Sequence, residues 1–132
     1  MPVPLPDAAR VAVDGLSFAT VATLEPDGSP HTSVVWITRE GDVLVFSTVL
    51  GRRKTENMQR DPRVSVLVLD SENSYRYLEV RGRASMTEQG GRELIDTLAA
   101  KYRGLERYPW DDAMSNVPVV CRVVADKVLW HG

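Results

Sequence analysis

The stretch of this sequence with the clearest chemical potential runs from residue 47 to residue 57. An apolar run ends here in two hydroxyl residues, and a glycine, three consecutive cations and an amide follow: Ser47, Thr48, Gly51, Arg52, Arg53, Lys54 and Asn57. A helix that begins at these cations would present unsatisfied N–H groups and a positive dipole end, where cations are unfavourable unless an anion lies among them. The pattern therefore predicts a phosphate or similar anion at the helix start, with solvated surface charges as the alternative.

Residue spacing places several of these side chains on overlapping faces of the predicted helix. Lys54 and Asn57 are three positions apart, and Arg53 and Asn57 are four apart. Side chains at these spacings are neighbours on a helix surface. We therefore expect them to point toward the ligand that Ser47 and Thr48 contact.

Catalytic and metal-binding patterns are sparse in the rest of the chain. The sequence has two histidines, His31 and His131, and one cysteine, Cys121, so a zinc site at the usual spacing cannot be built. Cys121 lies in an apolar run and is expected to be a buried strand thiol. No catalytic side chain can be assigned, and no phosphate-binding glycine loop or nucleophile elbow occurs. An enzyme of this composition would need a cofactor to carry its reaction.

Composition and length limit the classes of protein that fit. A chain of 132 residues suits one domain, here residues 1–132. A net charge of -2 and a pI near 5.7 argue against a general nucleic-acid binder, which needs a broad basic surface. No apolar stretch approaches 18 residues and no export signal is evident, so we expect a soluble, cytoplasmic protein without a membrane segment.

Turn signals and hydrophobic periodicity predict mostly strands. Strands are expected over residues 17–24, 30–38, 42–48, 64–70, 75–86 and 117–130, and helices over residues 7–13, about 53–60, and 87–104. Residues 64–69 and 119–124 are apolar on both faces rather than alternating. Both faces of such strands must be covered, which is typical of a closed barrel with helices or a second subunit packed outside. The predicted fold class is mainly β, within α+β.

The order of these elements and their motifs resembles a known family. After a P-D-G turn come P-x-x-S-V-V-W-I, an E-G-D turn, V-L-V-F-S-T and then G-R-R-K-x-x-N-M-x-x-D-P-R-V. This pattern, which extends from Leu16 to Trp130, resembles the pyridoxamine 5'-phosphate oxidase-like split β-barrel family. Within that family it is most similar to the short oxidoreductases that depend on the deazaflavin coenzyme F420. The resemblance implies an FMN-binding-like split β-barrel with flanking helices, assembled as a homodimer with its cofactor in a groove between subunits.

The resemblance also implies which residues bind the cofactor. The positions that match the phosphate-binding ones are Ser47, Thr48, Arg52, Arg53, Lys54 and Asn57. The strand along the flavin ring matches Ser33, Val34, Val35 and Trp36. Trp36 and Tyr77 are expected to stack near the ring. Trp110, in the connector of residues 107–112 that leads to the last strand, is expected to be a packing residue.

The activity implied is hydride transfer from reduced F420 to a conjugated small-molecule acceptor such as a quinone, enone or tetrapyrrole. An FMN-dependent oxidoreductase is the alternative, because both cofactors present a tricyclic ring and a phosphate; the extra anionic groups of F420 suit several cations. A non-catalytic flavin or haem carrier is a further alternative, in which His31 or His131 would be the axial ligand. The Arg-x-His segment with which true pyridoxamine phosphate oxidases contact substrate is lacking, so vitamin B6 chemistry is not expected.

Overall fold

An antiparallel β-barrel occupies the centre of the structure, a computed structural model that describes residues 3–109 and 116–132. The strands are β1 (Phe18–Leu24), β2 (Pro30–Glu40), β3 (Val43–Val49), β4 (Arg63–Leu69), β5 (Tyr77–Thr87) and β6 (Pro118–His131). Their order around the barrel is β1-β2-β3-β6-β5-β4, and β4 pairs with β1 to close it. The predicted mainly β split-barrel architecture is confirmed.

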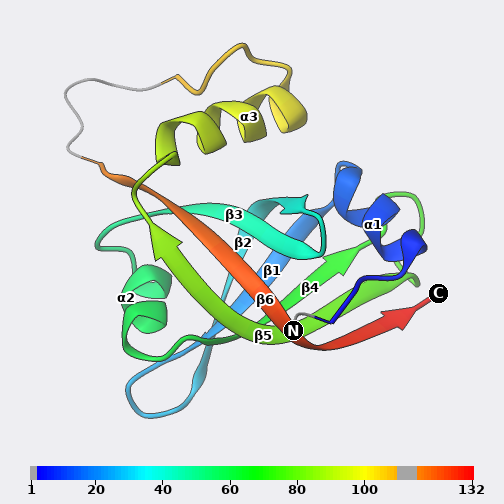
Figure 1. Cartoon of the computed structure of the whole chain (residues 1–132), viewed down its shortest axis with the longest axis horizontal. Coiled ribbons are helices and arrows are strands. Elements are labelled where there is room, and N and C mark those ends of the chain that lie inside the picture. The colour runs from blue at the N-terminus through cyan, green and yellow to red at the C-terminus, as the bar shows by residue number, and fades with distance from the viewer. Residues whose placement is uncertain (1–2, 110–115) are drawn as a thin grey trace.

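Three helices flank the barrel in the described part of the chain: α1 (Asp7–Asp14), α2 (Arg53–Arg60) and α3 (Gly91–Arg103). Figure 1 shows α1 and α2 at opposite ends of the barrel, with α3 along one side. Helix α2 ends where the sequence predicts, because Asp61 precedes Pro62 and has an extended backbone. Within the described ranges, no helix is both long and apolar enough to cross a membrane.

Strand β2 changes partner partway along its length, and this produces the split in the barrel. Its residues up to Trp36 pair with β1, whereas pairing with β3 begins at Ile37, opposite Phe46. Beyond Phe46, β3 continues against β6 rather than β2. The two strands therefore diverge at Ile37 and Phe46, a point we call the fork. The space between them is where a ligand can enter without breaking strand pairing.

Helix α3 is fastened to the fork by two consecutive side chains. The Ile37 N–H donates to the Tyr102 hydroxyl at 3.1 Å, and that hydroxyl donates to the Ser17 carbonyl. Lys101 Nζ donates to the carbonyls of Val13 and Ile37, both at 2.7 Å. Burial lowers the pKa of Lys101, since these carbonyls only partly replace water around the ammonium. These hydrogen bonds hold α3 against the fork between β2 and β3.

The barrel interior is filled by large apolar side chains from every strand. Among the fully buried are Ile37, Leu44, Phe46, Val66, Leu78 and Val80. At one barrel end the core is extended by Leu5, Ala9 and Val13, which come from α1 and the segment before it. Arg10 and the Leu5 N–H both donate to the Asp42 carboxylate in the β2–β3 turn, which fixes α1 across this end.

Strand β4 departs from the expectation that both of its faces are covered. Val64, Val66 and Val68 are buried, whereas Leu67 and Leu69 lie on the outer face and remain exposed. The strand thus alternates between inside and outside as strand geometry requires. An apolar outer face is left exposed in the single chain.

The start of α3 was predicted wrongly. Thr87 and Glu88 were expected to open the helix, but β5 continues through Thr87, which pairs with Val120 of β6. The helix begins at Gly91, after Gly90 adopts a left-handed backbone with φ of 82°. A Cβ on Gly91 would lie 2.4 Å from the Pro118 carbonyl oxygen, so this crossing needs a residue without a side chain. Trp110 lies outside the described residues.

Candidate functional site

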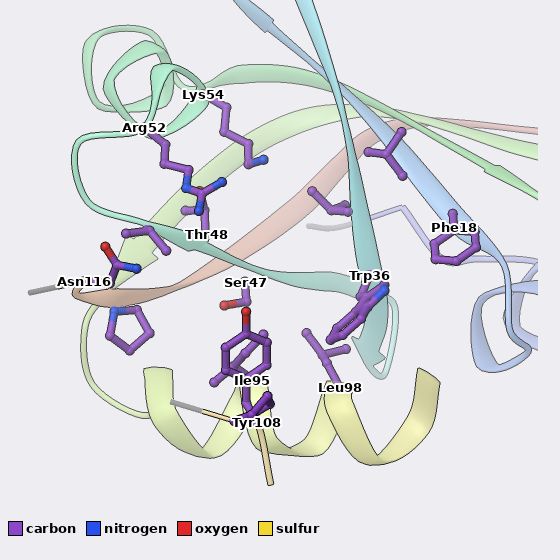
Figure 2. Close-up of a pocket in the computed structure, with 15 residues that line it drawn as sticks. Phe18, Trp36, Ser47, Thr48, Arg52, Lys54, Ile95, Leu98, Tyr108 and Asn116 are labelled. Atoms are coloured by element: carbon purple, nitrogen blue, oxygen red, sulfur yellow. The ribbon is translucent and has the colours of Figure 1, made fainter. Parts of the chain in front are cut away.

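A pocket of about 480 Å³ opens at the fork between β2 and β3. Its lining residues are Phe18, Val34, Val35, Trp36, Ser47, Thr48, Val49, Arg52, Lys54, Ile95, Leu98, Tyr108, Pro109, Asn116 and Pro118. Figure 2 shows that the pocket has two chemically different ends. Arg52 and Lys54 lie at one end, and Trp36 and Phe18 lie at the other. Helix α3 forms the wall opposite, through Ile95 and Leu98.

The cationic end contains two positive charges without a carboxylate partner among the described residues. Neither Arg52 nor Lys54 forms an ion pair or side-chain hydrogen bond in that part of the chain. Burial lowers the pKa of Lys54, and repulsion from Arg52 lowers it further. An anion bound between them would relieve both effects. We call Arg52, Lys54 and the neighbouring hydroxyl of Ser47 the anion subsite.

The turn after β3 positions the anion subsite. Gly51 has φ of 87°, and Arg52 follows in an extended conformation as the N-cap of α2. No side chain caps the first turn of this helix, so its N–H groups and positive dipole end are available to an anion. The sequence prediction of a helix start rich in cations is confirmed by this geometry.

A buried chain of hydroxyl groups joins α2 to β3. Thr55 Oγ1 donates to the Val49 carbonyl at 2.7 Å and lies 2.9 Å from Thr48 Oγ1. Because the proton of Thr55 is used on Val49, Thr48 must donate in the bond between the two threonines. Thr48 therefore has no proton left for a ligand. Ser47, which forms no hydrogen bond through its side chain within the described residues, is the hydroxyl that can donate into the pocket.

Phe18 and Trp36 line the aromatic end of the pocket, and Tyr102, which does not line it, stacks on both rings. Tyr102 lies between Trp36, at a centroid distance of 5.4 Å and an interplanar angle of 8°, and Phe18, at 5.6 Å and 23°. Val34 and Phe18 remain 66% and 59% exposed, so this end is open to the outside. A flat, apolar ring could lie against this wall with one face accessible.

Several residues of the predicted site lie outside the pocket. Arg53 is held by Glu25 at 3.2 Å, and Asn57 is buried against Thr23. Ser33 precedes the lining residues of β2 but does not line the pocket, and its buried Oγ has no hydrogen-bond partner among the described residues. Their predicted contacts with a cofactor stay predictions.

Tyr77 also lies away from the pocket. It stacks on His131 with ring centroids 5.0 Å apart, at the far end of β5 from Thr87. Trp36 and Tyr77 are therefore not neighbours in the same pocket within one chain. The sequence does not give the register in which the strands pair. It could therefore not show that Tyr77 lies at the end of β5 where His131 pairs with it, away from the pocket.

The sequence did not identify the wall formed by Phe18, Ile95, Leu98 and Tyr108. Ile95, Leu98 and Tyr102 fall on one apolar stripe of α3 at three-to-four residue spacing, a pattern that predicts a packed helix face but not a pocket wall. The signal available in the sequence was that the apolar stripe is wider than the face of α3 that becomes buried. Leu98 is fully buried, but Ile95 is only half-buried. The stripe also does not predict the hydrogen bonds that the Tyr102 hydroxyl forms at the fork.

The remaining reactive side chains are unsuited to catalysis in this pocket. Burial raises the pKa of the Cys121 thiol to about 12, so it stays protonated at neutral pH. His31 lies 3.8 Å from the Glu25 carboxylate and does not line the pocket. No group of three or more potential metal ligands was found among the described residues.

Comparisons with known proteins place the chain in a family. The family model described as Pyridoxamine 5'-phosphate oxidase matches residues 5–122. A solved structure described as an F420 reductase is 26% identical, covers 95% of this chain and 98% of its own, and has a TM-score of 0.81. A conserved hypothetical protein from Mycobacterium tuberculosis is also 26% identical, with coverages of 98% and 86% and a TM-score of 0.78.

General Stress Protein 26 from Bacillus anthracis has the same fold at 21% identity, with coverages of 93% and 90% and a TM-score of 0.70. The residues that the family model matches include β1 to β5, the start of β6, the fork and the anion subsite. The chain belongs to the pyridoxamine 5'-phosphate oxidase family of split β-barrel proteins.

Proposed function

We propose that this protein is an oxidoreductase that binds coenzyme F420 and transfers hydride from its reduced form to a conjugated small-molecule acceptor. The observation that carries the proposal is a pocket with two different ends. Arg52 and Lys54, which have no carboxylate partner in the described part of the chain, lie at one end, and a stacked aromatic wall lies at the other. A phosphorylated tricyclic cofactor has this same division of charge and apolar surface. The 26% identity to a protein described as an F420 reductase favours the deazaflavin among such cofactors.

The residues present fit this group. Arg52 and Lys54 would bind the phosphate by charge-assisted hydrogen bonds, and Ser47 would add a neutral donor. Trp36 and Val35 would lie along the ring, where they exclude water from one face. When bound, the reduced deazaflavin would supply the hydride, and the protein's part is to hold and orient it. We propose solvent as the proton source, because the aromatic end of the pocket is open.

FMN is the second candidate, because its phosphate and ring would use the same two ends of the pocket. Arg53 bears on the choice. It follows Arg52 in the chain on the face of α2 next to β1, its side chain is 66% exposed, and only one of its guanidinium nitrogens bonds Glu25. It could therefore meet the anionic tail that F420 has beyond its phosphate, which FMN lacks. A haem carrier is not favoured, since neither His31 nor His131 lines the pocket.

We further propose that the protein acts as a homodimer. Outward side chains of β1, β2 and β4 form an exposed apolar surface that contains Phe18, Val34, Leu67 and Leu69. Strand register supports its continuity, because Thr20 lies between Val34 on one side and Leu67 on the other. Phe18 and Val34 also line the pocket, so a second copy on this surface would cover the open end of the site. The predicted role of Tyr77 depends on such a second copy.

Light scattering at micromolar concentration tests the dimer. We expect a dimer with an interface of about 2,000 Å² or more, as in obligate dimers. Leu67→Glu should produce monomers and weaken cofactor binding, because the residue is on the proposed interface but outside the pocket. The matched control is Val11→Glu on α1, where an equally apolar and more exposed side chain should be replaceable without loss of the dimer. A monomeric wild-type protein would refute this part of the proposal.

The decisive test of the function is a side-by-side titration of F420 and FMN, followed by stopped-flow oxidation of each reduced cofactor with quinones, enones and tetrapyrroles. We expect tighter binding of F420 and its oxidation by at least one acceptor. Tight binding of F420 without turnover of any acceptor would indicate a carrier. Reaction with FMN alone would overturn the cofactor assignment.

A further inference from the structure

Helix α2 has a second face, directed away from the pocket and toward the end of β1. The side chains on this face are Arg53, Asn57 and Arg60, at the i, i+4, i+7 spacing of one helical stripe. Their partners are three consecutive residues: Glu25 for Arg53, Thr23 for Asn57, and the carbonyl of Leu24 for Arg60. We call this set of contacts the α2–β1 clamp.

Asn57 is the buried centre of the clamp. It is 2% exposed, and its Nδ2 donates to Thr23 Oγ1 at 3.0 Å, while Thr23 itself is fully buried. Its Oδ1 accepts a hydrogen bond from Arg60 at 3.1 Å. Both ends of the amide are thus committed to protein partners. Asn57 does not line the pocket, so contact with a ligand there would require this buried side chain to move out of the clamp.

The clamp and the hydroxyl chain together fix how α2 is rotated about its own axis. Thr55 fastens one side of the helix to β3, and Asn57 fastens the other side to β1. The two anchoring residues, Thr55 and Asn57, lie one and three positions after Lys54. They therefore determine where the side chains of the anion subsite and the first N–H groups of the helix point. Binding sites lose affinity when the residues that support them are removed, even if the contacting groups remain.

We propose that Asn57 is a positioning residue of the anion subsite, which acts through its hydrogen bond to Thr23 and not by contact with the ligand. The inference rests on the proposed function, since it takes Arg52 and Lys54 as the groups that hold the cofactor phosphate. It assigns a role to Thr23, a residue that neither lines the pocket nor carries charge.

The test compares Thr23→Val, Asn57→Leu and the double variant, which are neutral changes of similar size and leave the charge near the pocket unaltered. The quantity measured is the phosphate ratio: the Kd of the phosphate-free tricycle divided by the Kd of the phosphorylated one. Riboflavin and FMN give one ratio; the phosphate-free deazaflavin alcohol and F420 give the other. Because each ratio cancels binding of the ring, it reports the anion subsite and not a general loss of folding.

We expect each single change to lower the phosphate ratio by roughly tenfold, with little change in the Kd of the phosphate-free compounds. The double variant should lose no more than Asn57→Leu alone, because both changes remove the same hydrogen bond. Thr23→Ser keeps the acceptor oxygen and should restore the wild-type ratio. Ser17→Ala removes a buried hydroxyl that has no hydrogen-bond partner within residues 3–109 and 116–132, and it should leave the ratio unchanged.

An Asn57→Leu protein with a reduced ratio beside a Thr23→Val protein with the wild-type ratio would mean that Asn57 contacts the ligand itself, which overturns the inference. Unchanged ratios in both variants would overturn it as well. If Asn57→Leu does not fold, the pair Thr23→Val and Thr23→Ser still decides between these outcomes. A wild-type ratio near one would instead contradict the proposed function, since no phosphate would then be bound.

Discussion

The cations at the α1 end of the barrel differ from the two cations that line the pocket at the α2 end. At the α1 end, Arg10 is paired with Asp7 and Asp42, and Arg39 is paired with Asp14. At the α2 end, Arg52 and Lys54 face a pocket, and no carboxylate within the described ranges balances them. Paired charges hold the chain in place, whereas unpaired charges next to a cavity keep their binding capacity for a ligand. The difference supports the proposal that the α2 end of the barrel binds the ligand.

Lys54→Ala is expected to give the largest effect and tests this contrast directly. Loss of a charge-assisted contact should cost about 1.5 to 3 kcal/mol, or roughly ten- to a hundredfold in affinity for the phosphorylated cofactor. The matched change at the other end is Arg39→Ala, which should leave that affinity intact. Equal affinities for both variants and the wild type, measured by titration, would mean that Arg52 and Lys54 are ordinary solvated charges.

Asp42→Asn should reverse the pattern, with reduced stability and unaltered cofactor affinity. Hydrogen bonds from the Leu5 N–H and from Arg10 hold the pKa of Asp42 below its ordinary value of 3.8. Stability from such a carboxylate is present above the unfolded-state pKa and is lost as the pH falls through the folded-state pKa. The difference in Tm between wild type and variant should therefore be full at neutral pH and disappear in acid below about pH 3.8. A constant difference across this range would contradict the assignment.

Alkaline titration should sharpen the contrast within the anion subsite. In the ligand-free protein, burial and Arg52 lower the pKa of Lys54 below its ordinary value of 10.5, whereas a bound phosphate would favour the ammonium form. Affinity for the phosphorylated cofactor should thus fall as the pH rises through the pKa of Lys54, at values below 10.5. In Lys54→Arg the decline should move to higher pH, because a guanidinium stays charged. Coincident profiles for the two proteins would exclude Lys54 from the subsite.

The smallest expected effect is a gain in stability. Because the pKa of Lys54 is lower folded than unfolded, the charge opposes folding at neutral pH, and this penalty fades as the pH rises through the folded-state pKa. Lys54→Met should therefore raise the Tm of the ligand-free protein at pH 7 by about 2 to 5 °C. The gain should shrink in alkaline solution. An Arg39→Met protein, which loses its ion pair with Asp14, should show no gain.

Local sequence signals predicted the strands, the tight turns and the end of α2, because proline, glycine and alternating residues act over a few positions. They did not predict which side of α2 carries the ligand-binding groups. Lys54 and Asn57 are three positions apart and were expected to point the same way. In the structure, Asn57 meets Thr23 of β1 and Lys54 faces the pocket. That outcome depends on how α2 docks between β1 and β3, which pairwise spacing within the helix does not contain.

The aromatic wall was beyond sequence analysis for a related reason. Trp36, Tyr102 and Phe18 are far apart in the chain and come together only after β1 pairs with β2 and α3 docks at the fork. The pattern of α3 predicted an apolar stripe but not that part of it would line a pocket. Trp36, which lines the pocket, was named from the family resemblance. That inference used a matched motif and not the properties of the neighbouring residues.

The bond between the Ile37 amide and the Tyr102 hydroxyl provides a built-in reporter of motion. Its acceptor is a side chain 65 residues away, so the amide proton is released when α3 lifts from the fork, even if the barrel stays closed. Amide hydrogens protected by barrel pairing, such as those at the centre of β5, exchange with solvent only through larger openings. Comparison of exchange rates at Ile37 and in β5 would measure the free energy of exposing the pocket separately from that of unfolding the protein.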